Sequence, residues 1–303
     1  MDSPADRKIH TDPVPYLGGM AIVVAFTVAI LAGGTIAGFK GADLEVGVVL
    51  GGALALATLG LWDDLRGAPN WLKAVAEAGL GVALYAVGVR VQMFHNLPID
   101  LLLTVAWIVG ITNAVNLLDN MDGLSAGTAA IASASFFFLA AFSGQFLVAS
   151  LAAGLAGCAL GFGWHNRPPA KIFMGDAGSL FLGFMLAVLG LKLRFDNIER
   201  ITFFVPVAVM GLPILDTLVV SISRMRRGRS PFQPGRDHIS HRLVKTGIPP
   251  KAAVGLLLVG AAGFGWGGAI IAYSPQLTAS MLMSGLIFLG IFMGWLLMKV
   301  PVE

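Results

Sequence analysis

Four polar side chains recur at every third position where a long apolar run ends, in the stretch ITNAVNLLDNMDGLSAG of residues 111–127. They are Asn113, Asn116, Asp119 and Asp122. If the apolar helix continues through them, this spacing places all four in one row along its face. Asn and Asp are also common at helix ends that face water. Four such residues in register favour a functional site, because their oxygens can bind cations and move protons.

Three more carboxylates lie where phosphate chemistry would need them. Asp63 and Asp64 form a pair in LWDDLRG, and Asp176 stands between Gly175 and Gly178 in FMGDAGSL. Paired acids can hold Mg²⁺ or accept a proton from an attacking group, although two acids at a helix end are often only a solvated turn. A phosphate at the glycines would need a cation between itself and Asp176, which favours a metal ligand over an ordinary helix cap.

A strongly basic loop, residues 224–251, contains eight basic residues and one acid. The cluster Arg224–Arg229 is typical of a positively charged cytoplasmic anchor. Nucleic-acid binding is disfavoured, because no aromatic residues are interleaved with the charges. His238 and His241 follow Arg236 in the same loop. Zinc would need further ligands that the chain lacks, so these histidines suit phosphate contacts or proton handling better.

Helices that cross a bilayer must position these residues. The chain has 303 residues, of which 56% are hydrophobic and only 12% charged, whereas about a quarter of a soluble chain is charged. We expect an all-α polytopic membrane protein forming one domain, residues 1–303, because a span needs about 20 apolar residues and every backbone group must be bonded within it. Ten segments are predicted to span: 16–38, 44–62, 71–89, 99–118, 124–142, 145–164, 179–195, 201–223, 252–273 and 276–298.

The distribution of basic residues predicts the orientation. Ten spans place both termini on one side, and the loops of that side contain 15 of the Lys and Arg residues against 5 on the other. The basic side is expected to be cytoplasmic, in the plasma membrane, with both termini. All the candidate site residues fall at this face. The single cysteine, Cys158, excludes an internal disulfide. Gly157 and Gly161 form a small-xxx-small row that predicts helix packing.

Taken together, five stretches resemble the polyprenyl-phosphate N-acetylhexosamine-1-phosphate transferases, which are glycosyltransferase family 4. Their superfamily also includes the phospho-N-acetylmuramoyl-pentapeptide transferases. In the family's order, the stretches are RKIHTDPVPYLGG (7–19), DD (63–64), NAVNLLDNMDGLSAG (113–127), FMGDAGSL (173–180) and RDHISHRL (236–243). The match covers nearly the whole chain.

The resemblance implies a reaction and its partners. A polyprenyl phosphate attacks the sugar-linked phosphorus of a UDP-N-acetylhexosamine, UMP leaves, and a lipid diphosphate sugar stays in the membrane. The sugar is expected to be N-acetylglucosamine, and the product starts a cell-envelope polysaccharide such as lipopolysaccharide or teichoic acid. Mg²⁺, or Mn²⁺ in its place, is the implied cofactor. A homodimer is compatible with the resemblance, and no nucleic acid takes part.

Residue roles follow from the family's motifs. Asp176 matches the metal-binding aspartate, and Asn116 is expected to complete that site. The implied catalytic residues are Asp63, Asp64, Asp119, Asp122 and His238. The implied substrate contacts are Lys8, Lys73, Asn113, Phe173, Arg236 and His241, with Phe173 stacking on uracil.

Two departures from the family, and two alternative functions, stay open at this point. The hexosamine branch shows His-Ile-His-His where this chain has His238-Ile239-Ser240-His241, so the role of Ser240 is undetermined. The family also has a span before the RKIH loop, so either the start lies upstream of Met1 or that helix is dispensable.

Muramoyl-pentapeptide transfer, with three consecutive histidines, is the alternative within the superfamily. A secondary transporter is the alternative outside it, although its polar groups would lie near the bilayer midplane. Glu77 and Asp216 lie within spans without an assigned role.

Overall fold

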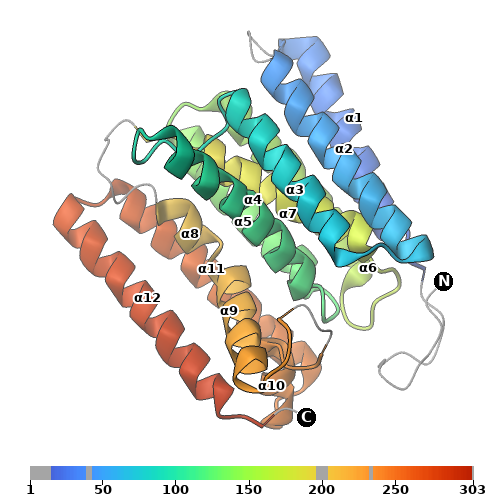
Figure 1. The fold of residues 1–303 in the computed structure, drawn as a ribbon, viewed down its shortest axis with the longest axis vertical. Helices are drawn as coiled ribbons and strands as arrows, with labels where there is room; N and C mark the ends of the chain where they lie inside the picture. The colour runs from blue at the N-terminus through green and yellow to red at the C-terminus, as the bar shows by residue number, and fades with distance from the viewer. Residues whose placement is uncertain (1–14, 39–42, 196–203, 232–234, 302–303) are drawn as a thin grey trace.

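The computed structural model describes residues 15–38, 43–195, 204–231 and 235–301, and every regular element in these ranges is a helix. This confirms the predicted all-α fold class (Figure 1). The helices are α1 (Gly18–Ala37), α2 (Asp43–Arg66), α3 (Asn70–Ala86), α4 (Leu97–Leu118), α5 (Leu124–Phe142), α6 (Phe146–Asn166), α7 (Gly175–Lys192), α8 (Val205–Val209), α9 (Gly211–Arg226), α10 (Ile239–Lys245), α11 (Pro250–Tyr273) and α12 (Gln276–Met298).

Eight of these helices are long and apolar enough to cross a membrane, so the chain is a multi-pass membrane protein. They are α1, α2, α4, α5, α6, α7, α11 and α12. Two of the ten predicted spans are not in this set. α3 has 17 residues, and the segment predicted as a single span over 201–223 contains two helices, α8 and α9. The number of crossings therefore stays a prediction.

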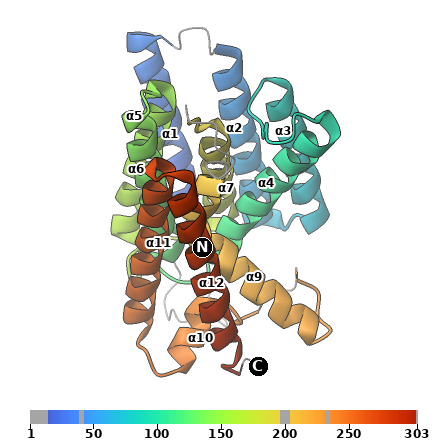
Figure 2. The same cartoon turned by 90° about the vertical axis from the view of Figure 1, so that its left-hand side faces the viewer.

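The break between α8 and α9 lies at Met210, and its cause is Pro213. A proline at this position cannot donate to the carbonyl of Val209, and its ring would clash with that carbonyl in a continuous helix. Pro213 is tolerated where it is because it lies in the first turn of α9, which begins at Gly211. Figure 2 shows the result: α9 slants across the bundle, whereas α11 and α12 stand nearly upright.

α7 is the central helix of the bundle. It packs against α1, α2, α4, α5 and α6, and every residue from Ala177 to Leu191 is buried. A helix that is apolar on all sides is expected in the interior of a large helical protein. The first turn of α7 contains the predicted metal ligand Asp176. At the other end, Lys192 forms an ion pair with Glu45 of α2.

Glycines let neighbouring helices approach α7 closely, but they are not the glycines that the sequence pattern indicated. A Cβ atom on Gly19 would lie 2.6 Å from the Cα of Gly178, and one on Gly183 would lie 2.8 Å from the Cα of Thr112. Only hydrogen fits in these spaces. The predicted packing row was wrong within the described chain: apart from the backbone of its own helix, no atom of the described residues lies within 4 Å of the Cβ position at Gly157 or Gly161.

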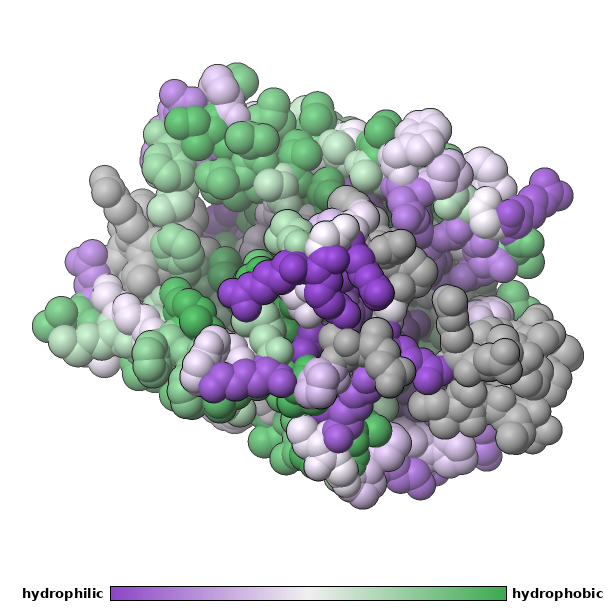
Figure 3. All heavy atoms as spheres, turned by 60° about the horizontal axis from the view of Figure 1, so that its bottom comes forward, coloured by the Kyte–Doolittle hydropathy of each residue, from purple (hydrophilic) through white to green (hydrophobic). Residues whose placement is uncertain are grey.

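One end of the bundle, which we call the polar end, collects the predicted site residues. α2, α4, α6, α9 and α12 end there, while α1, α3, α5, α7 and α11 begin there (Figure 1). Viewed from this end, hydrophilic side chains gather near the centre of the face, with hydrophobic residues above and to the left of them (Figure 3). Four separate loops therefore meet at one place, as the sequence map required.

Candidate active site

Lys73 lies between two of the predicted carboxylates and joins three helices. Its Nζ atom is 2.6 Å from Oδ2 of Asp63 and 2.8 Å from Oδ2 of Asp176. The side chain of Lys73 is only 12% exposed, so both ion pairs are partly shielded from water. Asp63 also accepts the backbone N–H of Ala68 at 2.5 Å, which holds its carboxylate against the start of α3. α2, α3 and α7 thus bring three predicted residues into direct contact.

The carboxylate of Asp64 caps α7. Its two oxygens accept the backbone N–H groups of Asp176, at 2.9 Å, and Ala177, at 3.1 Å. These groups have no partner within the helix, and a negative charge favours the N-terminal end of the helix dipole. Gly175 makes the approach feasible, because its φ is +64° and a Cβ there would lie 2.9 Å from the Cγ of Asp64. Asp176 is therefore not the cap of its own helix, and its side chain faces the site.

Asn116 and Asp176, predicted to share a metal site, lie in contact. The Nδ2 atom of Asn116 donates to Oδ1 of Asp176 at 3.1 Å and to Oγ of Ser179 at 2.8 Å. Ser179 in turn donates to the carbonyl of Gly175 at 3.1 Å. Since both amide hydrogens of Asn116 are used in this way, its carbonyl oxygen is the atom left to face a ligand.

The four polar residues that open the sequence argument do not form one helical row. α4 ends at Leu118, and Asp119 and Asp122 follow in a turn that Gly123 closes with a φ of +77°. Asp122 accepts the backbone N–H of Ala170 at 2.9 Å and so ties this turn to the loop before α7. The spacing of three assumed one continuous helix, and that helix stops after the second of these residues.

Asp119 carries the clearest electrostatic signal in the cluster. Burial raises its pKa to about 7, and the negative charges of Asp176, Asp64 and Asp122 act in the same direction. Its carboxylate accepts no hydrogen bond from the described residues. Asp119 can therefore hold or release a proton near neutral pH.

An aromatic pair borders the acids where the chain enters α1. Three backbone hydrogen bonds join the two segments: Phe173 N–H to the Pro15 carbonyl (3.0 Å), Gly18 N–H to the Phe173 carbonyl (3.0 Å), and Gly19 N–H to the Met174 carbonyl (3.1 Å). They place the ring of Tyr16 5.8 Å from that of Phe173.

Tyr16 was not among the residues that the sequence analysis selected. Burial raises the pKa of its phenol, and the charges of Asp64, Asp119 and Asp176 raise it further, so the hydroxyl lies close to the acids and stays protonated. The signal that could have found Tyr16 is an aromatic residue two positions before a close-packed glycine in PVPYLGG.

The histidine loop lies at the same end of the bundle. His238 is buried, and its Nδ1 atom is 2.7 Å from Oδ2 of Asp216 in α9. The ring of His241 lies 6.2 Å from that of His238. Burial lowers the pKa of His241 to about 4, and the positive charges of His238 and Arg236 lower it as well, so this ring is neutral at pH 7.

Much of the positive charge in this loop has a structural use. Asp237 is buried and receives two hydrogen bonds from Arg224, at 2.9 and 2.7 Å, and one from Arg227 at 2.9 Å. Burial would raise the pKa of Asp237, but these contacts outweigh it and lower the pKa. Arg242 donates to the carbonyls of Asp237 (2.8 Å), Leu297 (3.1 Å) and Val300 (2.9 Å). The loop is thus bound to both α9 and the end of α12.

Comparison with known proteins agrees with the motifs. A family model described as glycosyl transferase family 4 matches residues 46–194. A probable undecaprenyl-phosphate N-acetylglucosaminyl 1-phosphate transferase of Bacillus subtilis is 31% identical, over 98% of this chain and 81% of its own length. The chain belongs to glycosyl transferase family 4.

Further family-4 relatives come from other bacteria. A decaprenyl-phosphate N-acetylglucosaminephosphotransferase of Mycolicibacterium smegmatis is 34% identical over 92% of this chain and 77% of its own length. An undecaprenyl-phosphate alpha-N-acetylglucosaminyl 1-phosphate transferase of Escherichia coli K12 is 27% identical over 86% of this chain and 74% of its own length. The family-4 match contains the acid cluster, and the histidine loop lies beyond it.

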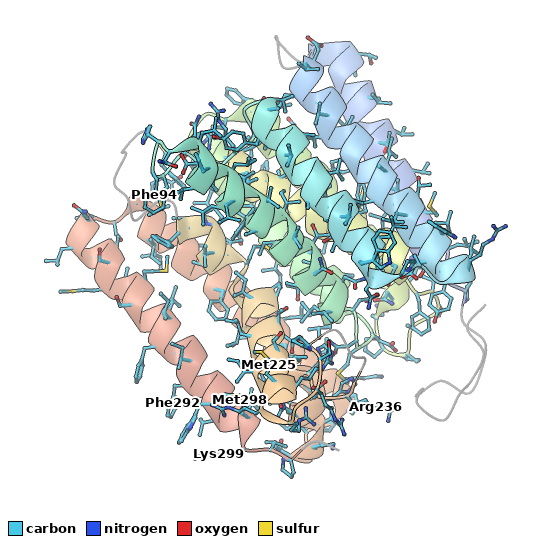
Figure 4. All side chains as sticks on the ribbon, viewed as in Figure 1. Phe94, Met225, Arg236, Phe292, Met298 and Lys299 are labelled. Carbon is cyan, nitrogen blue, oxygen red and sulfur yellow. The ribbon has the colours of Figure 1, made fainter. Side chains whose placement is uncertain are left out.

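Three further residues were predicted to contact the substrate. Lys8 lies outside the described residues. Arg236 is exposed at the polar end of the bundle (Figure 4). Asn113 donates to the buried carboxylate of Glu77 and, at 2.9 Å, to the Val109 carbonyl. Their substrate contacts stay predictions.

Binding of a divalent cation by the acid cluster of this family-4 chain stays a prediction. Asp63 and Asp176 both contact the Lys73 ammonium group, and Asp64 accepts the backbone N–H of Asp176. Burial raises the pKa of Asp119, and the charges of Asp176 and Asp64 raise it further. In the ranges that the structure describes, no group of three or more Asp, Glu, His or Cys side chains is arranged to hold a metal ion as it stands. Mg²⁺ suits such a site, because it takes one or two carboxylates and fills its remaining positions with water and phosphate oxygens.

Proposed function

We propose that this chain transfers N-acetylglucosamine 1-phosphate from its UDP-sugar to a polyprenyl phosphate and releases UMP. The observation that carries the proposal is the convergence of Lys73, Asp63, Asp64 and Asp176 at one end of a membrane bundle. The names of the family-4 relatives supply the substrate class. A lipid acceptor also explains why a charged site lies at the end of membrane helices.

The reaction is an exchange at one phosphorus atom. An oxygen of the lipid phosphate forms a bond to the sugar-linked phosphorus, the bond from that phosphorus to the UMP oxygen breaks, and UMP leaves as the anion. Several phosphates meet at the site, so their charge must be balanced by cations. Bound Mg²⁺, held by Asp176 and Asn116, would neutralise part of this charge and stabilise the departing phosphate.

The chain's own residues divide the remaining work. Among the described residues, Lys73 provides the one ammonium group in contact with the two carboxylates. When substrate enters, this group can move from the carboxylates to a phosphate oxygen. Asp119, with a pKa near neutrality, is suited to accept a proton from the acceptor phosphate. Phe173 and Tyr16 offer flat apolar surfaces for the uracil ring.

The proposal also includes orientation and location. The polar end faces the cytoplasm of the plasma membrane, which the excess of Lys and Arg in the loops of that end supports. A nucleotide sugar would reach the site from that side, and the polyprenyl chain would reach it through the bilayer.

The test uses purified protein in detergent with undecaprenyl phosphate and Mg²⁺. UDP-N-acetylglucosamine and UDP-N-acetylmuramoyl-pentapeptide are offered separately, and UMP release is followed. Release from the first alone supports the proposal, and release from the second alone replaces it with the muramoyl branch. Asp176→Asn should lower turnover by at least about 10²-fold, while Glu45→Gln, at the far end of α2, should keep it. Full activity in Asp176→Asn would remove that carboxylate from the site.

A further inference from the structure

Asp216 is a buried acid that the acid cluster does not include. It lies in α9 and is 1% exposed. Its Oδ1 atom accepts the backbone N–H of Ile239 at 2.7 Å, and its Oδ2 atom is 2.7 Å from Nδ1 of His238. Asp216 thus supports the first turn of α10 and contacts the one loop histidine predicted to be catalytic. Charged residues within membrane proteins usually have a functional partner, and here the partner is His238.

The two contacts of Asp216 constrain where the protons lie. A backbone N–H can only donate, so Oδ1 of Asp216 must accept. If Oδ2 is also unprotonated, Nδ1 of His238 must carry the hydrogen that lies between them. A neutral imidazole has one protonated and one free nitrogen. Nε2 of His238 is then the free nitrogen, and it makes no hydrogen bond to any described residue.

The surroundings of His238 hold this arrangement in place. Asp237, the next residue on one side, is fixed by Arg224 and Arg227. Ser240, two residues further along, donates through Oγ to Oδ1 of Asn120 at 2.5 Å. The ring of His238 is therefore held by the contact of its Nδ1 atom with Asp216 and by a backbone that is anchored before and after it.

We infer that Asp216 is a positioning residue that fixes His238 with Nδ1 protonated and presents Nε2 to the substrate. As a neutral ring, His238 then accepts a hydrogen bond or a proton at Nε2. As a cation, it donates from Nε2 to a phosphate oxygen while Asp216 balances its charge. The effect on turnover rests on the proposed function, whereas the protonation pattern of the ring does not.

Asp216→Asn gives a sharp test, because the amide has only one acceptor. Its oxygen must stay on the N–H of Ile239, so its NH₂ group faces Nδ1 of His238. An NH₂ group can only donate there, so the neutral ring must lose its Nδ1 hydrogen and carry one on Nε2. The ring nitrogens of ¹⁵N-histidine-labelled protein, assigned with His238→Gln, report this change directly by NMR at a pH where the ring is neutral.

The expected result is an Nδ1–H ring in the unaltered protein and an Nε2–H ring in Asp216→Asn. Turnover should fall by about 10²-fold or more, because a histidine in the wrong tautomer cannot act as a base at Nε2. Asp216→Glu, which keeps two acceptors, should restore the Nδ1–H ring. The matched control is Asp100→Asn: Asp100 is also buried, and it accepts backbone N–H groups of Phe94 and Asn96 at the far end of the bundle.

Each remaining outcome separates the inference from the proposed function. An Nε2–H ring in the unaltered protein, or an Nδ1–H ring retained in Asp216→Asn, would overturn the inference. A tautomer change without loss of UMP release would uphold the positioning role and remove His238 from the reaction. If Asp216→Asn fails to fold while Asp100→Asn folds, the His238 tautomers of the unaltered protein and of Asp216→Glu still decide whether the inference holds.

Discussion

Ser240 donates a hydrogen bond to Asn120 across 120 positions of sequence, with 2.5 Å between Oγ and Oδ1. Asn120 lies in the turn that carries Asp119 and Asp122, while Ser240 lies in α10 between His238 and His241. This contact is therefore a direct link between the acid cluster and the histidine loop. Ser240 replaces a histidine of the family's hexosamine branch, and the structure gives the serine a partner of its own.

Removing this link should uncouple the two loops. Ser240→Ala leaves a partly buried acceptor on Asn120 without its donor, which costs about 1 kcal/mol of stability. Turnover should fall several-fold as the two loops lose their fixed relative position. The measurement is a double-mutant cycle with Asn120→Ala, in kcat and in Tm. The two effects should be non-additive by about 0.5 kcal/mol or more. Additive effects would show that the hydrogen bond carries no coupling. Thr246→Ala, which removes a hydroxyl bound only within its own helix turn, is the control.

Asp64→Asn should destabilise α7. The single oxygen of the Asn amide can still accept one backbone N–H. The NH₂ group of the amide would then face the second N–H, from Asp176 or Ala177. Loss of the cap and charge costs about 1–2 kcal/mol, seen as a lower Tm in detergent. Asp43→Asn, an exposed acid in the first turn of α2, should change little. Inactivation of Asp64→Asn with an unchanged Tm would instead assign Asp64 to the substrate alone.

Tyr16→Ala should weaken nucleotide-sugar binding. If the Tyr16 and Phe173 rings, 5.8 Å apart, receive the uracil, loss of one ring should raise KM for the UDP-sugar by about tenfold, equal to roughly 1.4 kcal/mol of stacking. Tyr16→Phe keeps the ring and should keep KM. Tyr85→Ala, at the far end of α3, tests for a general packing effect. Equal KM values for Tyr16→Ala and the unaltered protein would exclude Tyr16 from the binding site.

His241 should make the fold sensitive to acid. Its pKa falls from an ordinary value near 6.5 to about 4 in the fold, through burial and the charges of His238 and Arg236, against which Asp216 and Asp237 act. Below pH 6.5 the unfolded chain binds a proton that the folded chain refuses. Stability is therefore intact above pH 6.5 and is lost as the pH falls towards 4.

The expected size of this loss is on the order of 2 kcal/mol for a half-buried ring. His241→Gln removes the titrating group and should flatten the decrease in Tm between pH 7 and pH 4.5. His165→Gln, which changes an exposed ring, should leave the slope as it was. A slope unaffected by His241→Gln would refute the assignment of acid sensitivity to this residue.

The sequence predicted which residues meet better than how they meet. Apolar runs of about 20 residues give helices almost by necessity, and the polar ends of those helices must share a face, so Asp63, Asn116 and Asp176 were correctly grouped. The cap that Asp64 provides to α7 was not predictable, since it depends on contact between residues more than 100 positions apart. The role of Asp216 depends in the same way on a loop that folds back onto α9.

Two errors have local physical causes. The spacing of Asn113, Asn116, Asp119 and Asp122 assumed one helix, but the positive φ of Gly123 belongs to a turn, and α4 ends at Leu118. Glycine spacing alone cannot tell whether a small residue faces another helix or lipid. Gly157 and Gly161 have the expected spacing and face no neighbour in the described chain, whereas Gly183 has a backbone against it.

The anchoring of Arg242 to the Leu297 and Val300 carbonyls has a practical consequence for anyone producing the protein. Glu303 lies three positions after Val300, so a tag fused directly after Glu303 begins four positions beyond the second of these carbonyls. Movement of that segment would disturb the contacts of Arg242, which also donates to the backbone carbonyl of Asp237 beside His238. Purification handles at this terminus should follow a flexible spacer, and a preparation that loses turnover with a short tag and regains it after proteolytic removal has reported on this connection.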